Sequence, residues 1–184
     1  MLRCNRTAAI VIATASFLFV LLAAAGLLFV YSGVYDVSAS SEHNPFVAWT
    51  LHKTYEVSLH RHAGADVPPV DFLSLENIRA GARFYHSACA ICHGAPGRPP
   101  GAIALGLQPA APALLAATRR NNPILMFWVI KHGVNMTAMP AFGKSQPDST
   151  LWQTAAFLYH ARGIGRDEYE ALTGAGVGHA SVPE

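Results

Sequence analysis

Two cysteines and a histidine, Cys89, Cys92 and His93, form the most chemically distinctive pattern in this sequence. Two thiols three positions apart, with a histidine directly after the second, have the spacing at which a haem is attached covalently. Each thiol can add across one haem vinyl group, and the adjacent imidazole then reaches the iron. The spacing therefore predicts that this segment holds one c-type haem, with His93 as an iron ligand.

A second iron ligand is offered downstream by Met139, which stands directly before Pro140. Its thioether would fill the sixth coordination position, and ligation by methionine raises the reduction potential. Met136 and His132 are alternative ligands, but Met139 is favoured because Pro140 stiffens its loop. With both axial positions filled the iron has no open site for a substrate, which favours electron transfer over catalysis.

The Cys89–Cys92 pair also has three other interpretations. A zinc site is disfavoured because the usual second CxxC or HxxxH is missing. A thioredoxin-like redox pair needs a βαβ context, which the sequence does not offer. A structural disulfide stays open, although a histidine directly after the pair is unusual for one. The remaining cysteine, Cys4, precedes a long apolar segment and is not expected to join the site.

A long apolar run opens the chain and predicts a membrane anchor at residues 7–35. These 29 residues contain no charged side chain, whereas about 20 apolar residues suffice to span a bilayer. The helical core is expected from about Ala8 to Tyr31. A cleaved signal peptide, ending at the small residues 23–26, is the alternative. The uncleaved anchor is favoured because the apolar run continues to Val30.

The charges that flank this run predict its orientation. Arg3 and Arg6 precede it, and Asp36 and Glu42 follow it. The positive-inside rule then places residues 1–6 in the cytoplasm and everything after the anchor on the periplasmic side. The sequence thus predicts a single-pass protein of the cytoplasmic membrane.

Residues 36–70 are predicted to form a juxtamembrane helix and a linker. Asn44 and Pro45 mark a helix start, so a helix is expected over residues 46–63, packed at the membrane interface or against a partner subunit. This region also contains His43, His52, His60 and His62. They lack the spacing of metal ligands and are expected to be surface or interface residues, with a metal or pH-sensing role as the less favoured alternative.

Residues 71–163 are predicted to form the domain that holds the haem. Ser74 can cap a helix that runs into Cys89, and the Gly- and Pro-rich residues 94–112 read as an irregular loop. Asn122 and Pro123 predict a helix that Gly133 ends. A capping box at residues 150–153 predicts a last helix that extends to residue 162. Residues 164–184 are expected to be a tail, helical near residues 168–172 and flexible beyond.

These features together resemble a class I monohaem cytochrome c of the membrane-anchored bacterial type. The likeness rests on Gly81 and Tyr85 ahead of the two cysteines, on the attachment site itself, and on the Met139 loop. It implies a mainly α, small cytochrome c fold, with three to four helices around one covalent haem. Gly81 would let the last helix cross closely, where an aromatic such as Phe157 would meet it. A proline carbonyl would support His93, and the sequence leaves open whether it belongs to Pro109 or Pro112.

The resemblance also implies what the protein does. It would not be an enzyme but would carry single electrons between redox partner proteins of a respiratory chain, with haem c as its cofactor. A permanent cytochrome subunit of a membrane dehydrogenase, reductase or oxidase complex is the alternative. A haem sensor or peroxidase, in which the methionine is displaceable, is a third.

The charge balance bears on the class of partner. Residues 71–163 contain eight Lys and Arg against three acidic residues. This excess would steer the domain toward an acidic redox partner, or is ordinary solvated surface. Basic runs with interleaved aromatics are missing from the sequence, so a nucleic-acid partner is not expected.

Overall fold

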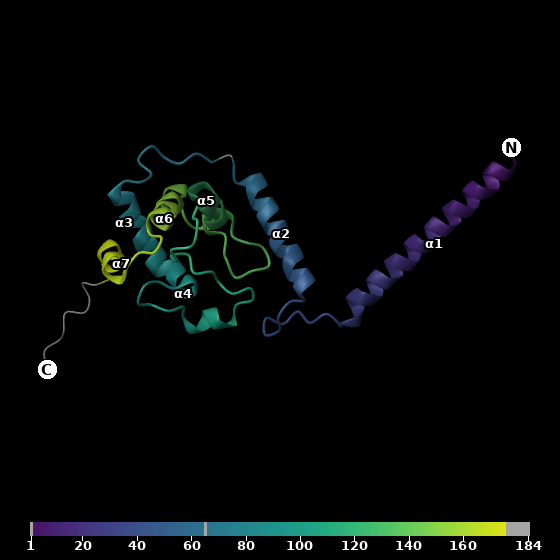
Figure 1. Ribbon diagram of the computed structural model, residues 1–184, viewed down its shortest axis with the longest axis horizontal. Helices are drawn as coiled ribbons and strands as arrows, with labels where there is room; N and C mark the ends of the chain where they lie inside the picture. Colours follow the sequence, from purple (N-terminus) through teal and green to yellow (C-terminus); the bar gives the residue numbers. More distant parts are fainter. Residues whose placement is uncertain (1, 65, 176–184) are drawn as a thin grey trace. The chain divides into compact units, whose positions relative to one another are not determined.

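The computed structural model describes residues 2–64 and 66–175, in which the chain folds as helices joined by loops (Figure 1). Within these ranges no β-strand forms, and an isolated β-bridge joins Ala95 and Arg98. The mainly α fold is therefore confirmed. The chain divides into two compact units, residues 1–41 and 42–184. The predicted flexible tail falls largely on residues 176–184, which lie outside the described part.

Helix α1 (Leu2–Ser32) is the apolar segment predicted as the anchor. Residues 6–32 of this helix are long and apolar enough to cross a bilayer. No other helix in the described part of the chain meets this condition. The side chains of residues 6–32 are exposed. An α-helix satisfies all its backbone hydrogen bonds internally, which a lipid environment requires. The helix ends where Gly33 adopts a positive φ of 65°, three residues before the boundary predicted from charge.

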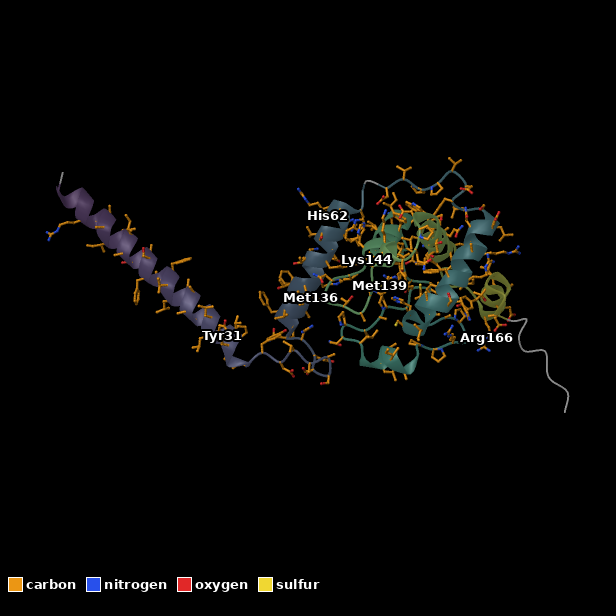
Figure 2. The ribbon with its side chains drawn as sticks, turned by 180° about the vertical axis from the view of Figure 1, so that it is seen from behind. Tyr31, His62, Met136, Met139, Lys144 and Arg166 are labelled. Carbon is orange, nitrogen blue, oxygen red and sulfur yellow. The ribbon has the colours of Figure 1, made fainter. Side chains whose placement is uncertain are left out.

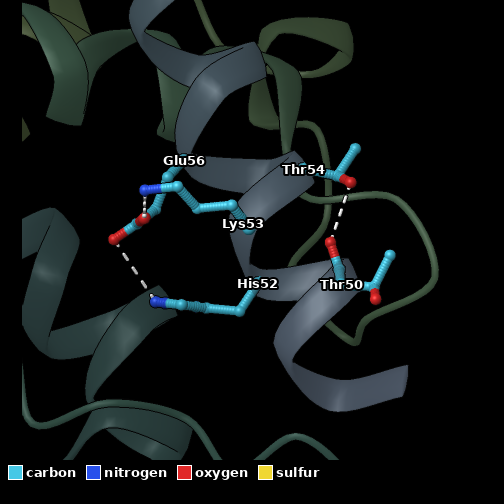
Figure 3. A network of polar contacts seen from close by, with 5 residues as sticks. All are labelled: Thr50, His52, Lys53, Thr54 and Glu56. Carbon is cyan, nitrogen blue, oxygen red and sulfur yellow. Dashed lines mark hydrogen bonds and ion pairs between the residues drawn. The ribbon is translucent and has the colours of Figure 1, made fainter. Parts of the chain in front are cut away.

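Helix α2 (Pro45–His62) begins where the sequence predicts. The Asn44 side chain accepts a hydrogen bond from the Phe46 amide at 2.9 Å and so caps the helix. On one side of α2 Glu56 lies between His52 and Lys53, and on another the Thr54 hydroxyl donates to the Thr50 carbonyl (Figure 3). This polar network is confined to one helix and leaves no ligand set for a metal.

Part of α2 packs on the rest of the second unit, to which this helix itself belongs. Leu59 and the following Ala63 are buried, and the His62 ring stacks on Trp128 with centroids 6.3 Å apart. Phe46 and Trp49 near the start of α2 remain exposed. The predicted contact of this helix with a membrane interface or a partner subunit stays a prediction.

A helical path of three parts leads to the attachment site. Helix α3 (Leu75–Phe84) is capped by the Ser74 hydroxyl, as predicted. A π-helical turn (Tyr85–Cys89) follows, in which the Ala90 amide donates to the Tyr85 carbonyl five residues earlier, and α4 (Ala90–His93) completes the path. The sequence predicts one uninterrupted helix here. The extra residue of the π turn allows Tyr85, Cys89 and Ala90 all to be buried.

Helix α6 (Asp148–His160) crosses α3 (Figure 1). The crossing point is at Gly81. A methyl group at Gly81 would overlap the backbone carbonyl of Gln153, so the two helices meet backbone to backbone. The close crossing that the family resemblance implies is thus present. The Phe157 ring packs on Tyr85 instead, one turn further along, with centroids 5.3 Å apart.

The predicted capping box at residues 150–153 is wrong. Helix α6 begins at Asp148, and Thr150 lies inside its first turn, where its amide donates to the Pro147 carbonyl at 3.0 Å. No side chain caps this end. Instead Asp148 places a carboxylate in the first turn, where the helix dipole favours it, and accepts a hydrogen bond from Lys131 at 2.8 Å.

Helix α5 (Pro123–His132) follows the predicted boundaries. The Asn122 side chain caps its start, and Gly133, with a φ of 68°, ends it. The buried Phe127 ring stacks on Trp152 of α6, with centroids 4.0 Å apart and planes within 6°.

A short 3₁₀ turn (Ala102–Gly106) interrupts the otherwise irregular loop of residues 94–112, and a second one (Phe142–Lys144) follows the Met139 loop.

Helix α7 (Arg166–Thr173) confirms the helical potential predicted near residues 168–172. Its Tyr169 side chain is buried against the core, and its hydroxyl lies 3.0 Å from Nδ1 of His86 on the π turn. The Arg98 guanidinium donates to the His86 carbonyl at 2.8 Å. Helix α7 therefore contacts and stabilises the π turn that precedes Cys92.

Asn121 joins the loop before α5 to the end of α6. Its side chain is 2% exposed and donates to the Leu114 carbonyl at 2.9 Å and the Leu158 carbonyl at 2.8 Å. Asn121→Ala leaves both acceptors buried without this donor, so we expect a loss of about 2–3 kcal/mol of unfolding free energy. Thermal unfolding of the holoprotein measures the loss, with the exposed Thr118→Ala as control. Equal melting temperatures for the two variants would contradict the assignment.

Candidate functional site

The two cysteines lie on consecutive turns of the helical path. Cys89 is the last residue of the π turn and is buried in the core, whereas Cys92 is half-buried in α4. Both are free thiols, so the structure does not adopt the disulfide that the sequence leaves open. Burial raises the pKa of the Cys89 thiol to about 12 because a thiolate is poorly solvated there. Such apolar surroundings suit a neutral thioether.

His93 ends α4, and its ring is oriented by the loop that follows. Its Nδ1–H donates to the Pro112 carbonyl at 2.8 Å, which leaves Nε2 as the nitrogen with a free lone pair. Of the two candidate prolines, it is therefore Pro112 whose carbonyl supports the histidine. Burial lowers the pKa of His93, the Pro112 hydrogen bond opposes this shift, and the nearby Arg119 cation adds to it. The neutral imidazole that results is the form that binds a metal.

The turn after His93 is fixed by a hydroxyl that sequence reasoning missed. The buried Tyr85 side chain donates to the Gly94 carbonyl at 2.7 Å, and burial raises its pKa far above the usual value, so the donor proton is kept. The sequence marks Tyr85 as an aromatic of the first helix. Its hydrogen bond across nine residues has no local signal, because it depends on how the chain turns at Gly94.

The two methionines of the distal loop differ in their surroundings. Met139 is half-buried and packs against the core cluster that contains Cys89. Its amide donates to the Thr137 hydroxyl at 3.1 Å, and its carbonyl accepts from the Val134 amide at 3.2 Å. Met136 has a φ of 58° and a side chain that is 84% exposed (Figure 2). Of the two, Met139 is therefore the one that the loop holds against the domain.

The third alternative ligand, His132, lies at the end of α5. It is exposed, and its ring lies against Trp128, with centroids 4.8 Å apart. The structure thus gives this histidine an aromatic neighbour within its own helix. His132 is the last residue of α5, where the sequence predicts the helix to end.

The chemistry of this donor set fits a covalently held haem. Two free thiols lie one helical turn apart, a neutral imidazole follows directly, and a thioether packs against the same core. The zinc alternative gains no support, since no cluster of three or more His, Cys, Asp or Glu side chains occurs among the described residues. Among the described residues, His43, His52, His60 and His62 belong to no such cluster.

Comparison with known proteins gives one match. Residues 76–158 match the family model described as cytochrome c oxidase, cbb3-type, subunit III. No curated protein and no solved structure matches the chain. The matched segment runs from the first turn of α3 to near the end of α6, so it includes the attachment motif, the Met139 loop and the Gly81 crossing. This match, on a helical domain with that donor set, supports a monohaem cytochrome c domain at residues 76–158, with one covalently bound haem c and a role in electron transfer.

Proposed function

We propose that Cys89 and Cys92 hold the haem through two thioether bonds, and that His93 and Met139 are its axial ligands. The His93–Pro112 hydrogen bond supports this proposal most directly, because it orients the imidazole and leaves Nε2 for the iron. Bound in this way, the haem supplies an iron that cycles between ferrous and ferric.

The protein's own residues would limit the structural change that accompanies this redox cycle. Tyr85 and Pro112 hold the turn and the ring that follow the cysteines, while the Thr137 and Val134 contacts hold the Met139 loop. Because both segments that would carry the ligands are fixed by hydrogen bonds, little rearrangement would accompany the transfer of one electron. If His93 and Met139 both bind the iron, no coordination position would be left for a substrate, which favours a carrier over an enzyme.

We further propose that α1 anchors the protein in the cytoplasmic membrane with the haem domain on the periplasmic side. The arginines before the span and the acidic residues after it support this orientation. Protease treatment of intact spheroplasts tests it. Digestion of the haem domain from outside is expected, and protection until the membrane is broken would overturn the orientation.

A second proposal, permanent membership of a membrane oxidoreductase complex, draws on the description of the matched family as an oxidase subunit. Purification in mild detergent separates the two proposals. A species that contains this chain alone supports the membrane-anchored carrier between redox partners. Co-purification of other subunits at fixed stoichiometry supports the complex.

The assignment of the sixth ligand is tested by a matched pair of variants. Met139→Ala is expected to lose the methionine-to-iron charge-transfer band, to lower the reduction potential and to let the reduced protein bind carbon monoxide. Met136→Ala is expected to leave all three unchanged, because that side chain is exposed. Absorbance spectra and a redox titration of the purified holoproteins measure these effects. The reverse result would assign the ligand to Met136.

A further inference from the structure

One side of helix α2 packs on the rest of its domain. The Leu59 side chain is buried, the Tyr55 side chain is half-buried, and the His62 ring stacks on Trp128 of α5. Leu59 lies four residues after Tyr55 and three before His62, spacings that place all three on one side of a helix. The opposite side of α2 therefore faces away from the domain.

That opposite side is apolar and aromatic at its start. Four residues follow one another at spacings of three or four positions and form one stripe, here called the outer stripe: Phe46, Trp49, Lys53 and Val57. Its three apolar side chains are each more than half exposed, and the two aromatic rings stack with centroids 6.1 Å apart. No other Phe, Trp or Tyr side chain in the described part of residues 42–184 is more than half exposed. Exposed apolar groups gathered in this way mark a surface that something else covers.

The charged residues around the outer stripe suit the headgroup layer of a membrane. Lys53 lies within the stripe, and Arg61 continues it four residues after Val57. The helix has one acidic side chain, Glu56, which lies at the edge of the stripe and pairs with His52 and Lys53. Lysine and arginine can lay their apolar stems along a hydrocarbon surface while their charges stay among polar groups. Aromatic and cationic residues on one exposed side are typical of a helix that lies in a lipid interface.

The chain itself keeps α2 close to the proposed membrane anchor. Residues 33–44 join the end of α1 to the start of α2, and a segment of this length spans at most about 40 Å. A turn shortens it, because Asp36 accepts hydrogen bonds from the Ser38 amide at 2.8 Å and from the Ser41 hydroxyl at 2.6 Å. A tethered surface needs little affinity of its own, since the tether keeps its effective concentration high. This continuity favours lipid over a separate protein as the partner of the outer stripe.

We propose that the outer stripe of α2 lies in the headgroup layer of the bilayer that α1 crosses. The Phe46 and Trp49 rings lie at the boundary with the acyl chains, and the Lys53 ammonium lies among the lipid phosphates. The inference rests on the proposed function, in which α1 is an anchor and the haem domain lies outside the membrane. It goes further, because a domain held by α1 alone is free to rotate, whereas one also held by α2 keeps one side toward the lipid. The carrier then presents the same surface to its redox partners at every encounter.

The test places a fluorophore on α2 of the full-length holoprotein, reconstituted at one chain per nanodisc of phosphatidylcholine and phosphatidylglycerol. Val57→Cys carries the label on the outer stripe, and His52→Cys carries it about 140° away around the same helix. Both variants also contain Cys4→Ser, so that the label has one thiol to react with. Iodide quenches a label in water, and doxyl-labelled lipid quenches one in the bilayer. We expect lipid quenching to be several-fold stronger at Val57 than at His52, and iodide quenching to show the reverse order.

Two double variants separate the outer stripe from other exposed apolar residues. Phe46→Ser with Trp49→Ser removes both rings and is expected to bring the Val57 label into contact with iodide. Val67→Ser with Val70→Ser removes two exposed side chains that lie outside α2, and should leave that label in the lipid. Both double variants should keep the haem spectrum and the melting temperature of the parent protein, because every substituted side chain is exposed.

Equal iodide quenching of the Val57 and His52 labels would overturn the inference, because the outer stripe would then lie in water. A Val57 label protected from both quenchers would also overturn it, and would indicate that protein covers the stripe. Failure of the anchor is a separate result. A chain that alkaline carbonate extracts from the membrane would refute the proposed anchoring by α1, whatever α2 contacts.

Discussion

A Cys89→Ser, Cys92→Ser double variant is expected to carry no covalently bound haem. The serine hydroxyl is close in size to the thiol but does not form the thioether bond to a vinyl group, so the cofactor is released on denaturation. The effect is all or none, which makes it the largest expected of any substitution in the chain. A denaturing gel of the membrane fraction, stained for haem, measures it at the full-length mass.

Cys4→Ser is the matched control for the double variant. Cys4 precedes the apolar run of α1 and is remote in sequence from the attachment motif, so this variant should stain as strongly as the wild type. A haem-positive band in the double variant would refute attachment through Cys89 and Cys92. The two free thiols would then need another explanation, such as dithiol chemistry.

Gly81→Val is expected to prevent the haem domain from assembling. A Cβ at this position overlaps the Gln153 carbonyl and approaches the Thr154 amide, and both are backbone groups of α6 that cannot rotate away. Separating α3 from α6 would also loosen the Tyr85–Phe157 contact. Overpacking typically costs 1–3 kcal/mol, and we expect about 3 kcal/mol or more here because neither helix can yield locally. The measurement is the melting temperature of the holoprotein together with its yield.

Gly106→Ala is the control for this prediction. Nothing lies within 4 Å of a Cβ placed at Gly106, so the substitution should leave both yield and melting temperature close to those of the wild type. Gly81→Ala adds the smallest possible side chain and should be intermediate between the wild type and Gly81→Val. A Gly81→Val protein as stable as the control would mean that the two helices do not cross as described.

Local signals in the sequence predicted the helix boundaries well where a single side chain controls them. Asn44, Ser74 and Asn122 each cap a helix through their own side chain, and Gly133 ends one through its positive φ. The pattern at Thr150 failed because the N-cap of α6 is Pro147, three residues earlier, and the Pro147 carbonyl accepts a hydrogen bond from the Thr150 amide. The helix propensity of the residues does not tell whether a side chain or the backbone begins a helix.

The site was predictable in part. The cysteine and histidine spacing is local, so the sequence alone indicates the cofactor. The choice of Pro112 over Pro109 depends on how nineteen residues of loop fold back to the ring, and no local pattern encodes that path.

The π turn at Tyr85–Cys89 constrains how the length of this chain can vary. Such a turn holds one more residue than a turn of α-helix, and each residue of an α-helix rotates the chain by about 100°. Deleting one residue from this turn would restore a regular α-helical turn and leave α4 near its present orientation. Deleting one residue from α3 would instead rotate α4 by about 100° and carry Cys92 and His93 away from their present face. The loop of residues 94–112 has no such periodicity. We therefore expect insertions and deletions to be tolerated in that loop and selected against in α3.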